Sequence, residues 1–291
     1  MSELVDCINS LSAKDIIKSV AKTANGVPFY IQTNGLSGFC AEFQAVRDAY
    51  VGTIPDAIQL EAQNTMACGL VAAGVWAKLD VLFVMANGDS PNCLLNWINP
   101  GTFTLIPVNA PTFTAWEGIQ GGGVDEYTNC PWIPSVNGVN YTANSASYGI
   151  YSRSNVDENS IDAGANSLTS DSLLWLRNAG DASIRINSIN TSAGANADSL
   201  GFYVVNKEDL TVAQDLWKNK VKIIDDTKIN QGLPTVAFFI AAQNNIGVPA
   251  SFSTRQYSMF FAGAGLTQTE IENFTDIFEV YMDFLGNGVI P

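Results

Sequence analysis

The sequence predicts a mainly β protein: an antiparallel β-sandwich with flanking helices and a small α-rich segment at its N-terminus. Three observations predict this fold. About a dozen short stretches after Asp80 alternate apolar and polar residues, with polar loops and no helical period between them, which is typical of a sandwich or jelly roll of two packed sheets. One helical apolar stripe precedes these stretches, and a second one closes the chain. The first 52 residues follow a different, more helical pattern.

Residues 1–52 are predicted to form a docking segment. The expected elements are helices over 2–11 and 12–24, a strand over 27–32 and a helix over 42–50. Asn25-Gly26 marks the end of the second helix. A piece of about 50 residues is marginal as an independent core. Its apolar faces are therefore predicted to dock on another protein.

Residues 53–291 are predicted to form one domain that contains the sandwich and both flanking helices. The first helix begins at Thr53-Ile54-Pro55-Asp56, with proline in its first turn, and its apolar stripe runs to Leu79. In the strand over 183–188, Ile184 and Ile186 face one way and Arg185 faces the other. The strands are expected over 81–85, 94–98, 103–108, 112–116, around Tyr127, and over 146–151, 173–177, 183–188, 202–205, 216–217 with 221–223 as a hairpin, 235–242 and 257–262.

The closing helix has the sharpest signature in the chain. Thr267 and Glu270 have the spacing of a capping box. Apolar residues at helical spacing follow as far as Leu285, and Gly286 ends the helix. This pattern predicts an amphipathic helix packed on the flank of the sandwich.

Charge and hydropathy argue against two classes of partner. The net charge is −14 and no basic run occurs, so nucleic acid, which binds proteins through Lys and Arg, is not expected. No apolar stretch of about 18 residues is present, and no charged-then-apolar leader begins the chain. Membrane insertion and classical export are therefore not expected. Synthesis and assembly in the cytoplasm are expected instead.

Histidine is absent, which excludes imidazole-based catalytic triads and histidine-ligated metal sites. No cofactor is expected. The five cysteines are Cys7, Cys40, Cys68, Cys93 and Cys130. Their wide spacing without C-x-x-C favours reduced, mostly buried thiols, and one intermolecular bridge remains an alternative.

Four segments are distinctive in combination. They read G-V-W-A-K-L over 74–79, L-L-N-W-I-N-P-G over 94–101, N-A-P-T-F over 109–113 and N-Y-T-A-N-S-A-S-Y-G-I-Y over 140–151. Together with the end of the domain, over 239–270, they resemble bacteriophage virion proteins that carry a concanavalin A-like lectin/glucanase (laminin-G-like) jelly roll. The resemblance implies a virion component, such as a tail or head fibre or a capsid decoration protein, assembled in the host cytoplasm. Other virion proteins are then the expected partners of residues 1–52. It also implies a homo-oligomer, for which we expect a trimer, and a jelly roll that faces host surface glycans.

Catalysis is not expected. A glucanase of this fold places its carboxylates on one strand as E-x-D-x-E or E-x-D-x-x-E, and that motif is missing. Asp125-Glu126, Glu208-Asp209 and Asp225-Asp226 are adjacent pairs, whose side chains would point to opposite faces of a strand. The predicted function is thus a non-enzymatic virion structural protein. The alternatives are a carbohydrate-binding receptor protein and, third, a glycan-cleaving enzyme.

Aromatic rings beside amides are the candidates for sugar binding. Trp116, Tyr127, Trp132 and Tyr141 lie in or near predicted loops, with Asn129 among them. The alternative is that these rings are buried in the sandwich or at a subunit contact. Two interpretations remain for residues 155–159 (N-V-D-E-N): a calcium site made of side-chain oxygens, and a polar hairpin tip. The spacing of these oxygens fits no standard calcium-binding loop.

Overall fold

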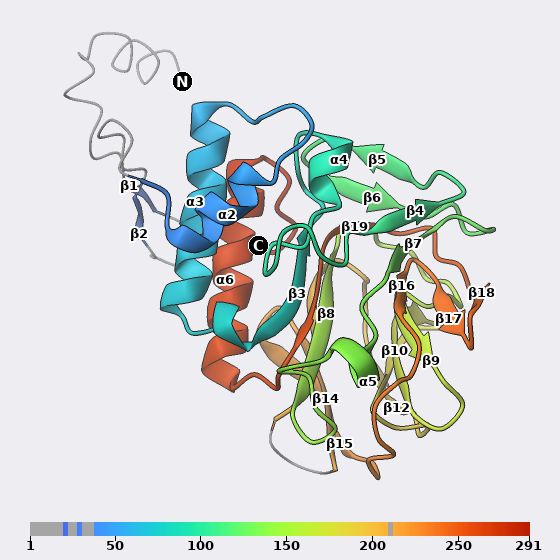
Figure 1. Ribbon diagram of the computed structural model, residues 1–291. Coiled ribbons are helices and arrows are strands. Elements are labelled where there is room, and N and C mark those ends of the chain that lie inside the picture. Colours follow the sequence, from blue (N-terminus) through green and yellow to red (C-terminus); the bar gives the residue numbers. More distant parts are fainter. Residues whose placement is uncertain (1–19, 23–27, 31–37, 209–211) are drawn as a thin grey trace, which may run out of the picture.

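The computed structural model shows two β-sheets packed face to face, with helices covering one outer side (Figure 1). It describes residues 20–22, 28–30, 38–208 and 212–291. The predicted fold class, a mainly β sandwich with flanking helices, is confirmed. The helix predicted over 2–11 lies outside the described residues. The predicted boundary between residues 52 and 53 stays a prediction.

The first sheet has nine strands in the order β12-β11-β10-β9-β16-β7-β4, and β17 and β18 extend it beside β9. β17 pairs with β9 in parallel, while the main path is antiparallel. The bounds are β4 Ile106–Val108, β7 Tyr127–Cys130, β9 Ala163–Asn166, β10 Asp171–Asn178, β11 Asp181–Ile186, β12 Ser192–Ala195, β16 Phe238–Ile240, β17 Gln243–Asn245 and β18 Val248–Ala250.

The second sheet has eight strands in the order β15-β14-β13-β8-β19-β6-β5, and β3 pairs with β19. All of β8 and β19 is buried because both faces of this sheet are covered. Gly149 of β8 is required there, since a Cβ would collide with the carbonyl of Tyr203. The bounds are β3 Leu79–Val84, β5 Thr112–Thr114, β6 Gly118–Gln120, β8 Ala146–Ser152, β13 Gly201–Lys207, β14 Ala213–Lys218, β15 Val221–Thr227 and β19 Gln256–Gly263.

Apolar side chains from both inner faces form the main core. Phe238 of the nine-stranded sheet contacts Tyr148 and Phe260 of the other sheet, with ring centroids 5.1 and 5.5 Å apart. The inward side chains of β10 and β11 belong to the same cluster. This alternation buries one face of each strand, which is the arrangement that the sequence pattern predicts.

Helices cover the outer face of the eight-stranded sheet (Figure 1). Phe274 and Phe278 of α6 pack on Phe202 of β13, with ring centroids 5.0 and 6.4 Å apart. Phe43 and Val46 of α2 are buried in the same cluster, so the end of the predicted docking segment contacts the body. The helices are α2 Ala41–Asp48, α3 Ala57–Ala72, η1 Trp76–Lys78, α4 Ser90–Cys93, α5 Pro134–Asn137 and α6 Gln268–Phe284.

Several predicted elements are confirmed and others are wrong. Thr267 and Glu270 form the predicted capping box. The first flanking helix ends at Ala72 rather than Leu79, because Gly74 takes a φ of 74° and starts a new turn. The strand predicted over 94–98 is instead a loop that meets β3 through one isolated bridge at Asn96.

At the N-terminus, Val20–Lys22 forms strand β1 against β2, Pro28–Tyr30. The helix predicted over 12–24 is therefore wrong at these three residues, where backbone pairing replaces the helix. The strand predicted over 27–32 is confirmed for Pro28–Tyr30. Among the described residues, none of the helices combines the length and the apolar character needed to cross a bilayer.

The cysteine prediction is wrong for one pair. Cys40 and Cys68 form a disulfide that joins the start of α2 to α3 across 28 residues of sequence, with Cα atoms 6.0 Å apart. The tertiary packing of α2 on α3 brings them together, which the spacing along the chain does not reveal. Cys93 and Cys130 are free and buried, as expected, and Cys7 lies outside the described residues.

Candidate functional site on the open face of the sandwich

The outer face of the nine-stranded sheet is partly exposed along β10, β11 and β12, because the helices pack on the other sheet. Inward residues of these strands, such as Leu174 and Ile184, are fully buried. The outward residues include Trp175, which is half-buried. It lies opposite Ser183, which in turn lies opposite Ala193. Since these neighbours are small, the indole is the largest side chain of this row.

Arg185 lies beside the indole and is held in place. Its guanidinium carbon is 5.7 Å from the centre of the Trp175 ring, within the range of a cation–π contact. Its Nη1 donates to Asp171 Oδ2 at 2.6 Å, and its Nε donates to Thr191 Oγ1 at 2.9 Å. Asp171 is only 2% exposed. This ion pair is therefore partly shielded from solvent, which strengthens it relative to a surface pair.

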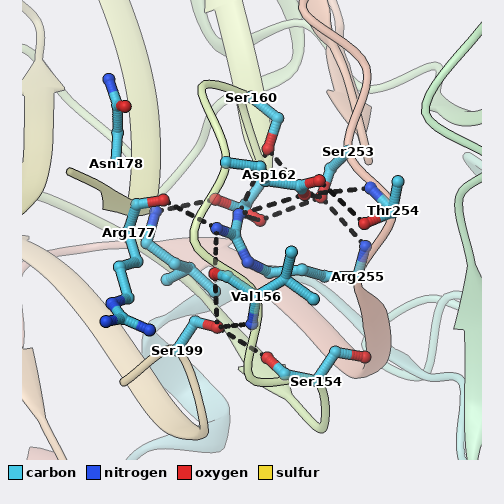
Figure 2. Close-up of polar contacts among 12 residues, drawn as sticks. Ser154, Val156, Ser160, Asp162, Arg177, Asn178, Ser199, Ser253, Thr254 and Arg255 are labelled. Atoms are coloured by element: carbon cyan, nitrogen blue, oxygen red, sulfur yellow. Dashed lines mark hydrogen bonds and ion pairs between the residues drawn. The ribbon is translucent and has the colours of Figure 1, made fainter. Parts of the chain in front are cut away.

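Arg177 is the next outward residue of β10 after Trp175. Its Nη1 donates to Asn155 Oδ1 at 3.3 Å, and its Nε lies 3.5 Å from Asp157 Oδ2. Figure 2 shows that its guanidinium points away from Arg255. We call Trp175, Arg177, Ser183 and Arg185 the Trp175 surface.

A buried ionic network anchors the loop that carries the partners of Arg177 (Figure 2). Arg255 and Asp162 are both fully buried, and Arg255 Nη1 donates to Asp162 Oδ1 at 2.7 Å. Arg255 Nη2 donates to the carbonyls of Val156 and Arg177, each at 2.8 Å. Burial by itself lowers the pKa of Arg255, but the charge and hydrogen bond of Asp162, together with the interactions of Tyr257 and Glu158, outweigh burial, so this pKa lies above its usual value. The guanidinium thus joins the loop to β10.

Glu158 strengthens the same anchor. Its carboxylate accepts hydrogen bonds from the Thr254 backbone N–H and hydroxyl, at 3.0 and 2.8 Å, and from the Ser253 hydroxyl at 2.8 Å. Burial raises the pKa of Glu158, but these donors stabilise the charged form more, and the pKa lies below its usual value. The carboxylate therefore stays ionised.

The loop over 155–159 uses its oxygens to hold itself in place. Asn155 accepts from Ser199 N–H and Asp157 accepts from Ala179 N–H, at 3.2 and 2.7 Å. Among the described residues, no group of three or more acidic or thiol side chains is placed to hold a metal ion. These contacts support the hydrogen-bonded loop over the calcium alternative, and the segment is a β8–β9 connection rather than a hairpin tip.

Two of the residues predicted to bind a ligand lie in the core. Trp132 is 0% exposed and Tyr141 is 1% exposed, and their rings meet edge to face at 5.6 Å. Trp132 follows β7 with the same inward parity as Cys130, and the Tyr141 hydroxyl bonds to Ser172. Neither ring can reach a ligand in this structure. Their predicted place in ligand-contacting loops is therefore wrong, and the buried alternative applies to them.

The other three predicted residues lie at two further places. Tyr127 and Asn129 are on the outer face of β7, where Tyr127 packs on Phe239 with ring centroids 4.4 Å apart. Trp116 is half-buried against Gly88 and has a φ of 64°. The structure thus does not bring the five predicted residues into one site. Whether any of these three binds a ligand stays a prediction.

The sequence held a signal for the Trp175 surface that was not used. Leu174 and Leu176 alternate with Trp175 and Arg177 in a predicted strand, just as Ile184 alternates with Arg185. This parity places the ring and both cations on the outer face. The pairing of β10 with β11, which places Arg185 beside Trp175, was not visible in the sequence.

No protein-family model and no curated protein match the chain. Solved structures do match it. A mutant of HCR/D has a TM-score of 0.50 at 8% identity, over 69% of this chain and 52% of that one. Trypanosoma rangeli sialidase in complex with sialic acid has a TM-score of 0.51 at 12% identity, over 70% of this chain and 34% of that one. The chain thus spans about half or less of these proteins. The likeness shows the fold alone, a sandwich of two β-sheets.

Proposed function

We propose that this chain is a lectin-like module that binds carbohydrate through the Trp175 surface. The observation that carries the proposal is a half-buried indole on an open sheet, flanked by two guanidinium groups that protein partners hold in place. An indole offers a flat apolar face on which the C–H face of a sugar ring can pack. Guanidinium and hydroxyl groups donate to sugar oxygens. The sandwich fold supports the proposal only as a scaffold, because a fold does not fix a function.

The module is proposed to bind glycans without cleaving them. Asp157 and Asp171 are the carboxylates that contact the arginines of the Trp175 surface. Both are engaged with cations, and neither is paired with a second carboxylate across an open space, which glycoside hydrolysis requires. The surface therefore supports recognition rather than catalysis.

Replacing Trp175 with alanine is expected to weaken glycan binding by at least about 30-fold, which corresponds to the loss of about 2 kcal/mol for a central aromatic contact. The measurement is a glycan array followed by titration calorimetry on the best ligand. Trp116→Ala is the matched control, because Trp116 is also half-buried but lies away from this surface. Unchanged affinity in Trp175→Ala, or a loss confined to Trp116→Ala, would place the site elsewhere.

A second proposal is that the module is displayed on a phage particle, as the sequence resemblance implies. One observation favours it. The Cys40–Cys68 disulfide and α2 lie in the helical layer, on the side of the sandwich opposite the Trp175 surface (Figure 1). Attachment through the docking segment would leave the binding face pointing outwards. A disulfide also suits a protein that is exposed to oxidising surroundings after assembly.

Removal of residues 1–37 is expected to convert a homo-oligomer, for which we propose a trimer, into a monomer. A chain that begins at Gly38 keeps Cys40 and α2, so the described helical layer stays whole. Analytical ultracentrifugation of both chains measures the change, and far-UV circular dichroism checks that the shorter chain is folded. Equal numbers of subunits in the two chains would remove the attachment role from these residues.

A further inference from the structure

The Trp175 surface has unused hydrogen-bond donors. In the part of the chain that the structure describes, Arg177 uses Nη1 for Asn155 and faces Asp157 with Nε, while Arg185 uses Nη1 and Nε for Asp171 and Thr191. No protein acceptor among these residues takes the Nη2 group of either arginine or the indole N–H of Trp175. Three donor groups thus remain for a ligand.

The acceptors around these donors are already occupied. Asp171 accepts from Arg185 with one oxygen and from the Ser167 N–H with the other, at 3.2 Å. Asp157 accepts from the Ala179 N–H at 2.7 Å and faces Arg177 with its second oxygen. A ligand that mainly donates hydrogen bonds would find few free partners here. A ligand that mainly accepts them would complement the surface.

We propose that the Trp175 surface selects acidic glycans, whose sugars carry a carboxylate or a sulfate group. The inference rests on the proposed carbohydrate binding and adds the chemical class of the ligand. An oxyanion is an acceptor on every oxygen, and a guanidinium edge binds it through charge-assisted hydrogen bonds. The indole of Trp175 packs on the ring that carries the anion.

The net charge of the chain does not prevent this selection. At −14 the molecule repels anions at long range. At physiological ionic strength this repulsion decays over about 8 Å, so contact with the two arginines decides the affinity. Arg177 and Arg185 are themselves oriented by carboxylates, which fixes the direction of their free amino groups.

Titration calorimetry of the full chain with matched oligosaccharide pairs tests whether the ligand is an acidic glycan. Each pair is a uronate-containing, sialylated or sulfated oligosaccharide and its neutral form, obtained by carboxyl reduction, desialylation or desulfation. The acidic member of at least one pair is expected to bind about 10- to 100-fold more tightly, the effect of hydrogen bonds to a charged group.

Two variants assign the effect to the arginines. Arg177→Gln and Arg185→Gln are each expected to remove most of the preference for the acidic member. Arg185→Lys keeps the charge that Asp171 needs, so it is the variant to use if Arg185→Gln unfolds. Arg47→Gln is the control, because Arg47 is an exposed arginine of α2 in the helical layer.

The outcomes separate the inference from the proposed function. Equal binding of both members of every pair would overturn the acidic class and leave carbohydrate binding intact. Failure of the wild-type chain to bind any member would overturn both. A preference that survives in Arg177→Gln and in the folded Arg185 variant, or that is lost in Arg47→Gln, would remove the two arginines from ligand selection.

Discussion

Replacing Asp162 with alanine is expected to lower the free energy of unfolding by about 3–5 kcal/mol, because the change leaves the buried Arg255 cation with only Glu158, 3.5 Å away, as a counter-charge. Asp162 accepts from Arg255 Nη1 at 2.7 Å, from the Tyr257 hydroxyl at 2.6 Å and from the Leu176 N–H at 2.7 Å. All of these groups are buried. Denaturant unfolding followed by fluorescence measures the change.

A double-mutant cycle shows whether the ion pair causes that loss. Arg255→Met removes the cation, and in the double variant with Asp162→Ala neither member of the fully buried pair is left without the other. The double variant is therefore expected to lose less stability than the two single changes added together, by about 0.5–3 kcal/mol. Asp157→Ala is the exposed control and is expected to cost about 1 kcal/mol or less. Additive single changes would show that the two residues act independently.

The buried network of Arg255 and Asp162 also affects the Trp175 surface. Arg255 holds the carbonyls of Val156 and Arg177, so the loop that carries Asn155 and Asp157 depends on it. Those two residues orient Arg177. The network is buried, yet through this loop it positions the side chain of Arg177 at the surface.

Replacing Trp132 with alanine is expected to cost about 3–5 kcal/mol of stability, the usual range for removing a buried Trp ring from a core. The ring packs between Tyr141 and Phe238, with centroids 5.6 and 6.3 Å away. Trp175→Ala is the matched comparison. It is expected to cost less, since that indole is half-buried on an open face. Chemical denaturation of both variants gives the two values.

Trp132→Phe separates a core role from the ligand role that the sequence predicted. The Trp132 indole N–H is buried and has no partner among the described residues. Removing it therefore forfeits no hydrogen bond and leaves a ring in the same space. The variant is expected to fold and to keep the wild-type affinity for glycan. A folded Trp132→Phe that no longer binds glycan would restore Trp132 as a ligand contact.

Local signals predicted several elements correctly because those elements depend on nearby residues. The capping box of Thr267 and Glu270 satisfies backbone groups within one helical turn. The hairpin at Asn219 and Lys220 follows in part from Asn219, a residue type that tolerates the positive φ of 48° found there. Strand alternation is equally local, since the side-chain period is a property of each strand.

Other features depended on contacts that are distant in sequence. An apolar run over 94–98 has the composition of a strand, yet only Asn96 finds a bridge partner in β3. Cys40 meets Cys68 because α2 packs on α3. Trp132 and Tyr141 follow loop-like polar segments, but the sandwich draws both rings inside.

The sequence by itself determined the class of the protein: an acidic, histidine-free antiparallel sandwich closed by an amphipathic helix. Periodicity and capping depend on residues that are close together in the sequence, and composition needs no structure, so all three can be recognised without the fold. The tertiary structure alone decided which outward residues meet. Arg185 lies beside Trp175 because β11 pairs with β10, and Arg177 is oriented because a buried ion pair holds a loop above it. Strand register and burial bring together residues that are distant in the sequence, and the candidate site is made of such residues.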